Sequence, residues 1–176
     1  MDRGRDFLKS QVNNAVMQHQ TFLKNLEDHE GQAEDARFRD LCTRYIPPMR
    51  EHQRMLEQYQ QTIGAELGTG KKALGAALGI ARDLADAARE SDFLRLVGDI
   101  VTARQSEDTF RTFATVGPQI AEPQLQQLGE MGQRHHHQYV QDANALVAQL
   151  FVEHVRGTDA ATSTSQGLSG EPRRAY

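Results

Sequence analysis

The sequence predicts an all-α fold, and three observations support this prediction. Apolar residues recur every three or four positions over long segments, which is the spacing of one face of an α-helix. Few segments show the strict alternation that is typical of a β-strand. The chain has 176 residues, and its 38% hydrophobic content can line one core if those residues are aligned on helix faces. We therefore expect long helices that pack side by side as a bundle.

The first two predicted helices cover about residues 6–29 and 34–67. Two adjacent prolines, Pro47 and Pro48, interrupt the apolar stripe of the second helix. Neither proline can donate a backbone hydrogen bond, and the residue before a proline is disfavoured in helical geometry. We therefore expect a sharp kink at this point, or a break after Tyr45.

A long connection separates these helices from the next pair. Five glycines lie between residues 64 and 79, and the segment 73–89 has the apolar spacing of a short helix within this crossover. The third long helix is expected to begin near Ser91, a typical N-cap residue. The fourth spans roughly residues 123–156, and the small polar residues from 157 to 176 predict a disordered tail.

Two helical hairpins joined by one crossover form a four-helix bundle, which we expect over residues 1–156, followed by a flexible tail over 157–176. The 20 Lys and Arg against 24 Asp and Glu give a formal charge of −4, which argues against nucleic-acid binding. The chain starts without the apolar core of a signal peptide, and no stretch approaches ~18 apolar residues. These features predict a soluble, cytoplasmic protein without a membrane partner. The single cysteine, Cys42, excludes an internal disulfide and a cysteine-based zinc site.

Each long helix carries an ionisable residue near the middle of its apolar stripe. These residues are His19, His52, Glu107 and, within the run 135–137, His136. Burying such groups costs free energy unless they are paired or bind something, and imidazole and carboxylate are ligands for iron, manganese and zinc. One hypothesis is a single metal ion held by His52, Glu107 and His136, with His19 as a further candidate. The alternative is a hydrogen-bonded polar layer that fixes helix register and binds no metal.

Register arithmetic favours Glu107 with His136 over His19 with His52. If the first turn centres near residue 32, the two histidines lie about six residues apart along the axis, roughly 9 Å, too far for one metal ion. If the last turn centres near residue 120, Glu107 faces position 133, one helical turn from His136.

Three segments together resemble the ferritin-like superfamily, most closely its small bacterial stress-associated members of the YciE/YciF type. The segments are PMREHQRMLEQY, RQSEDTFRTF and EMGQRHHHQYV. The resemblance implies a bundle with one crossover and a di-metal site built from a Glu on the first and third helices and Glu-x-x-His on the second and fourth. His52 and His136 then take the two histidine positions, and Glu107 takes the carboxylate position of the third helix.

The sequence departs from this pattern at the other carboxylates. Met49 and Gln133 stand three residues before the two histidines, and the first helix offers Asn13 and Asn14 at the expected level. Three of the four carboxylates that would offset the charge of two ferrous ions are missing. We therefore expect the di-iron oxidase chemistry of such relatives to be lost or strongly altered.

These observations leave three functional hypotheses. The first is a non-catalytic, stress-associated or interaction protein that forms a homodimer, with no cofactor or one metal ion. The second is a metal-dependent oxidase or peroxide-handling protein that uses His52, Glu107 and His136. The third is an adaptor or cargo protein that docks onto a protein partner through its tail, where GLSGEPRR follows a flexible spacer.

Overall fold

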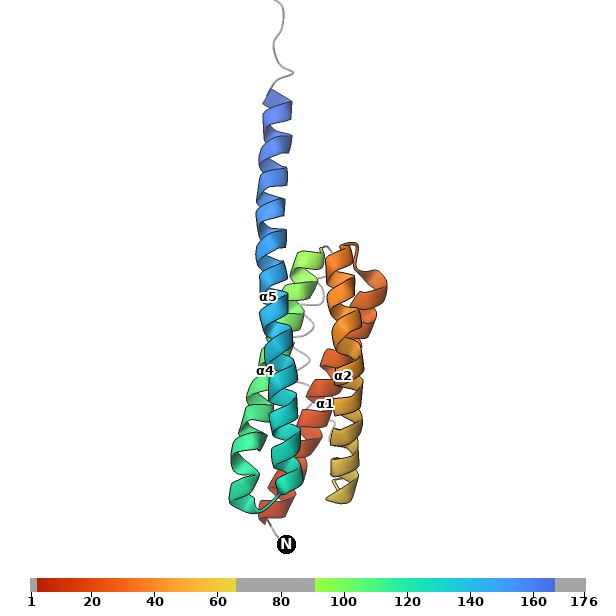
Figure 1. Ribbon diagram of the computed structural model, residues 1–176, viewed down its shortest axis with the longest axis vertical. Helices are drawn as coiled ribbons and strands as arrows, with labels where there is room; N and C mark the ends of the chain where they lie inside the picture. Colours follow the sequence, from red (N-terminus) through yellow and green to blue (C-terminus); the bar gives the residue numbers. More distant parts are fainter. Residues whose placement is uncertain (1–2, 66–90, 167–176) are drawn as a thin grey trace, which may run out of the picture.

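Residues 3–65 and 91–166 are described by a computed structural model, with side chains through residue 157, and these ranges are almost entirely helical (Figure 1). They contain no strand, so the all-α prediction is confirmed. The elements are α1 (Arg3–Gln32), α2 (Ala36–Thr62), α4 (Asp92–Val116), the short 3₁₀ helix η1 (Pro118–Ile120) and α5 (Pro123–Gln166). The predicted crossover helix over 73–89 lies outside the described residues.

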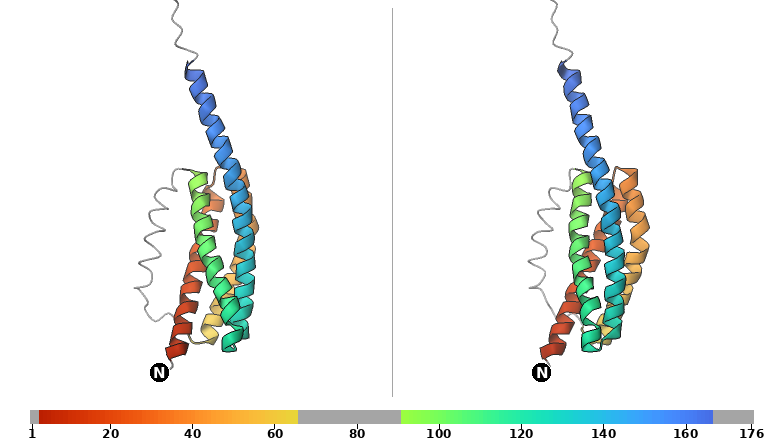
Figure 2. Two further views of the ribbon diagram at one scale, coloured as in Figure 1. Left: turned by 90° about the vertical axis from the view of Figure 1, so that its left-hand side faces the viewer. Right: turned by 60° about the vertical axis from the view of Figure 1, so that its left-hand side comes forward.

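Two antiparallel hairpins, α1–α2 and α4–α5, pack lengthwise against each other (Figures 1 and 2). Helix α2 begins at the N-cap Asp35, whose carboxylate accepts hydrogen bonds from the backbone N–H groups of Arg37 and Phe38. Ser91 caps α4 as predicted, because its hydroxyl accepts a hydrogen bond from the Leu94 N–H. In the turn after α4, Ala121 adopts the left-handed conformation and reverses the chain.

The predicted break after Tyr45 is wrong, because α2 continues through Pro47 and Pro48 (Figure 2). Pro47 is exposed and Pro48 is half-buried. The carbonyls left without a helical donor belong to Thr43 and Arg44, two residues on the exposed side of the helix, where water can donate instead. Burial of the apolar stripe on the opposite side of α2 outweighs the two lost hydrogen bonds.

Three helix ends differ from the predicted bounds. Helix α1 extends through Gly31 to Gln32, and α2 ends at Thr62, just before Gly64 takes a positive φ of 64°. Helix α5 continues to Gln166 and projects beyond the other helices (Figure 1), so the predicted helix end near 156 is too early. The remainder of the expected tail, 167–176, lies outside the described residues.

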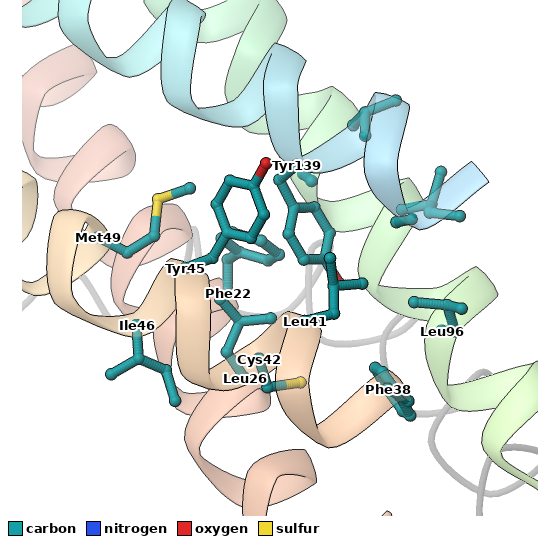
Figure 3. Close-up of a cluster of buried hydrophobic side chains, with 14 of the residues drawn as sticks. Phe22, Leu26, Phe38, Leu41, Cys42, Tyr45, Ile46, Met49, Leu96 and Tyr139 are labelled. Carbon is teal, nitrogen blue, oxygen red and sulfur yellow. The ribbon is translucent and has the colours of Figure 1, made fainter. Parts of the chain in front are cut away.

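The buried side chains form two apolar clusters, one toward each end of the bundle. The first surrounds Tyr139, whose ring lies 5.0 Å from that of Phe22 and 5.2 Å from that of Tyr45 (Figure 3). The second surrounds Phe110, which packs 6.2 Å from Phe113. Every long helix therefore passes from one cluster to the other near its middle.

A layer of buried polar residues separates the two clusters. It consists of His19 on α1, His52 on α2, Ser106 and Glu107 on α4, and His136 on α5. The prediction that ionisable residues interrupt the apolar stripes inside the bundle is confirmed for all four named positions.

Candidate metal centre

Three histidines from three helices converge in the polar layer. His19, His52 and His136 are completely buried. One ring nitrogen from each lies within 4.8 Å of the corresponding nitrogens of the other two. The closest pair is His19 Nε2 and His52 Nδ1, 3.2 Å apart. We call these three residues the histidine triad.

The position of the proton on His19 follows from its other nitrogen. His19 Nδ1 lies 2.9 Å from Oε1 of Gln53, and the amide nitrogen of Gln53 donates to Glu57 at 2.7 Å. The amide orientation is therefore set by Glu57, and the oxygen that faces His19 can only accept. His19 consequently carries a proton on Nδ1.

The same argument applies to the other two rings. His52 Nε2 lies 3.1 Å from the carbonyl oxygen of Leu128, and His136 Nδ1 lies 2.8 Å from that of Gly132. A carbonyl oxygen only accepts, so both nitrogens carry protons. In each ring, the hydrogen bond on the outer side fixes which nitrogen is protonated.

The triad is neutral at physiological pH. Burial, reinforced by the neighbouring histidines, lowers the pKa of His19, His52 and His136 to about 3. A neutral imidazole has only one N–H. The inward nitrogens, namely His19 Nε2, His52 Nδ1 and His136 Nε2, therefore carry lone pairs.

Nothing in the described part of the protein donates to these lone pairs. His136 Nε2 is buried without a hydrogen-bond partner. His19 Nε2 and His52 Nδ1 face each other with a lone pair on each, which is repulsive. A buried acceptor without a donor costs about 1–3 kcal/mol, so the arrangement is unfavourable unless a cation lies among the three nitrogens.

The nearest pair of nitrogens has the spacing of a transition-metal site, and the third nitrogen, within 4.8 Å of the others, must move closer to bind the same ion. With metal–nitrogen bonds of about 2.0–2.1 Å in a tetrahedral site, two bound nitrogens lie about 3.3 Å apart, close to the 3.2 Å observed for the nearest pair. Metal-binding histidines characteristically donate their other N–H to a carbonyl or carboxylate, and all three triad rings donate to a carbonyl-type oxygen.

Phe110 and Gly132 complete the walls of the site. The Phe110 ring lies 4.6 Å from the ring of His52 and 5.2 Å from that of His136. A Cβ atom at position 132 would lie 2.3 Å from Cε1 of His52, so only glycine leaves room for that imidazole. The site is enclosed and closely packed.

Glu107 has different partners from those that we expected. Its Oε1 accepts hydrogen bonds from His137 Nδ1 at 3.0 Å and from Arg111 at 2.9 Å. The structure thus pairs Glu107 with His137, the neighbour of His136 on α5. Of the four predicted ligands, it brings His19, His52 and His136 together and leaves Glu107 outside this group.

The predicted separation of His19 and His52 is wrong. The turn between α1 and α2 centres near position 34, midway between Gln32 and Ala36, and not near 32. Each residue by which a turn centre moves shifts the pairing of two antiparallel helices by two residues. The axial offset falls to about three residues, or about 4.5 Å, which the two side chains can span.

Four buried polar residues were missed in the sequence, namely Gln53, Gln60, Asp99 and Ser106. Gln53 follows His52 directly and orients His19. Asp99 accepts a hydrogen bond from His29 Nδ1 at 2.8 Å and a longer one from Tyr139 at 3.4 Å, and burial raises the pKa of its carboxyl group. The spacing of Asp99 from Leu96 and Ala103, three and four residues, is the signal that could have placed it on the buried face.

No protein-family model, curated protein or solved structure matches this chain. The ferritin-like resemblance therefore stays a prediction. Across residues 3–65 and 91–166, no helix combines the length and the apolar character needed to cross a membrane.

Proposed function

We propose that this protein binds one divalent transition-metal ion through the histidine triad. The observation that carries the proposal is the convergence of three buried, neutral imidazole nitrogens, each with its lone pair directed inward and its N–H satisfied elsewhere. This is the donor set of a metal site. The competing interpretation, a polar layer that only fixes register, leaves three lone pairs without donors.

The ligand chemistry favours zinc among the metals that we expected. Imidazole suits zinc, copper, nickel and iron, whereas manganese prefers carboxylate and carbonyl oxygens, and non-haem iron(II) sites combine two histidines with a carboxylate. The acidic residue of the polar layer, Glu107, is engaged by Arg111 and His137. Three protein ligands leave a fourth tetrahedral position for a water molecule or a small anion.

The proposed role is non-catalytic metal binding within a bundle that lacks the carboxylates of a di-iron centre. All three ligand side chains are inaccessible to solvent, and an aromatic ring packs against them. Such a closed site holds an ion firmly and offers a substrate little access. We place the protein, on its sequence resemblance, with ferritin-like bundle proteins whose di-metal site has degenerated.

Metal analysis tests the proposal. Protein expressed without an affinity tag and purified without a metal column should contain, or take up from Zn²⁺ solution, about one ion per chain. His19→Ala, His52→Ala and His136→Ala should each abolish uptake, while His154→Ala, on an exposed stretch of α5, should not. Absence of stoichiometric uptake by the folded wild-type protein would refute metal binding.

A further inference from the structure

His135, the residue before His136 on α5, has a buried ring nitrogen without a hydrogen-bond partner, as His136 does. Its ring is partly exposed, but its Nδ1 is buried and has no hydrogen-bond partner. This nitrogen therefore has a lone pair or a proton that nothing in the described residues pairs with. A solvent-facing polar side chain has no evident reason to bury a nitrogen without a partner.

The His135 ring lies beside the triad. Its centroid is 6.3 Å from that of His52, with the rings perpendicular, and the centroids of His52 and His136 are also 6.3 Å apart. Two imidazoles bound to one ion have centroids about 5–6 Å apart. The His135 and His52 rings lie slightly beyond this range, so His135 adjoins the site without belonging to the group of nitrogens within 4.8 Å of one another.

The triad needs such a neighbour because its own residues have no exposed surface. A hydrated dication must lose its water molecules before it reaches the three nitrogens, and this loss is costly unless protein ligands replace the water. On the other side of the layer, His137 and Glu107 are already bonded to each other, and Arg111 adds a positive charge there. An incoming cation would have to compete with His137 and Arg111 for the Glu107 carboxylate there.

We propose that His135 is a loading ligand, which binds the metal ion at the surface and transfers it to the triad. This inference rests on the proposed function of the triad. The transfer is a ligand exchange without redox change: the bond from the ion to His135 breaks as bonds to the triad nitrogens form, and the displaced water molecules leave to solvent. His135 accelerates both loading and release and is not a ligand in the final site.

Stopped-flow binding of Co²⁺, which has visible absorption in tetrahedral sites, tests this role. In His135→Ala and His135→Phe, the association and dissociation rates should both fall at least about tenfold, while the equilibrium dissociation constant stays within about threefold of the wild-type value. Alanine opens space and phenylalanine fills it, so slowing in both variants separates the loss of a ligand from a change in access. Free imidazole should restore the rate of the alanine variant and not that of the phenylalanine variant.

The matched control is His137→Ala, which removes the next histidine of the same run and should leave both rates unchanged. Circular dichroism and thermal unfolding verify that each variant is folded. Wild-type rates in both His135 variants would overturn the loading role while leaving the triad site intact. A large loss of affinity at an unchanged association rate would overturn it too, because His135 would then be a permanent ligand. A folded wild-type protein that binds no Co²⁺ would overturn both proposals.

Discussion

His19 Nε2 and His52 Nδ1 lie 3.2 Å apart in the centre of the bundle, and the hydrogen bonds on the outer sides of the two rings leave no proton between them. Two lone pairs at this distance repel each other in a dry environment. Together with the unpartnered nitrogen of His136, this contact makes the metal-free bundle less stable than an apolar interior of the same shape.

The substitution His136→Met should affect the stability of the metal-free protein and that of the metal-loaded protein differently. It removes a buried acceptor without creating another, because the outer hydrogen bond of His136 goes to a carbonyl of its own helix. The metal-free variant should be as stable as the wild type, or more stable by about 1 kcal/mol. Urea unfolding should show no stabilisation by Zn²⁺ in the variant and clear stabilisation in the wild type. A metal-free variant destabilised by several kcal/mol would mean that the imidazole has a stabilising partner.

Gln53→Met should weaken metal binding although Gln53 is not a ligand. Without the amide oxygen, His19 can move its proton to Nε2 and donate to His52, which removes the lone pair that the metal needs. Loss of a partner of this kind typically lowers metal affinity about 10–100-fold. Competition with a chelator measures the change. Gln60→Met, which removes a similarly buried amide bonded to Asn13, should retain the wild-type affinity.

Features that belong to a single helix could be predicted from the sequence, whereas features that depend on how two helices meet could not. A polar residue on an apolar helical stripe is a property of one helix, so His19, His52, Glu107 and His136 could be placed in the core from periodicity alone. Which of them meet depends on the length of the turn between helices, and an error of two residues at the α1–α2 turn displaced His52 by a full helical turn. Tautomers depend on partners such as Gln53 and Leu128, which are set only by the assembled bundle.

The proline pair shows that a rule based on local sequence can fail within a single helix. Pro47 and Pro48 predict a kink or a break when they are considered alone, yet α2 does not break, because both freed carbonyls lie on the exposed side. Only the orientation of the helix in the bundle decides whether water can reach those carbonyls. Asp99 was missed for a related reason, since a carboxylate next to Ile100 suggests a solvent-facing position until His29 and Tyr139 are seen beside it.

The stability of the metal-free protein should fall as the pH decreases below about 6.5. The native pKa of each triad histidine, about 3, lies below the ordinary histidine pKa of about 6.5, so the unfolded chain takes up protons in this range and the native state does not. Each histidine then contributes a loss of up to about 1.4 kcal/mol per pH unit between pH 6.5 and 3. Asp99 acts in the opposite direction, because its raised pKa favours the protonated native state as the pH falls.

Urea unfolding of metal-free wild type and His136→Met at pH 7.5, 5.5 and 4.5 measures this dependence. The variant lacks one of the three histidines, so its stability should fall less steeply than that of the wild type. Equal slopes, or a wild-type stability that rises on acidification from 6.5, would show that the triad is not held neutral in the native state.

Gly132→Ala should damage both the fold and the site. The added methyl group would lie 2.3 Å from Cε1 of His52 and 2.5 Å from the Phe110 ring, and overpacking of this kind costs about 1–3 kcal/mol. Alanine is the better helix former by about 1 kcal/mol, so any net loss reflects the contact with the two rings. Gly98→Ala is the control, because nothing lies within 4 Å of its added methyl group, and this variant should be at least as stable as the wild type. Thermal unfolding and Zn²⁺ titration of both variants decide the outcome.

X-ray absorption spectroscopy at the zinc edge of the Zn²⁺-loaded protein measures the proposed coordination most directly. The triad predicts three imidazole ligands at about 2.0–2.1 Å, one further light-atom ligand and no sulfur, and His136→Met should not form this site. A zinc site with fewer than three imidazoles in the wild type, or one whose spectrum is unchanged in that variant, would contradict binding by His19, His52 and His136.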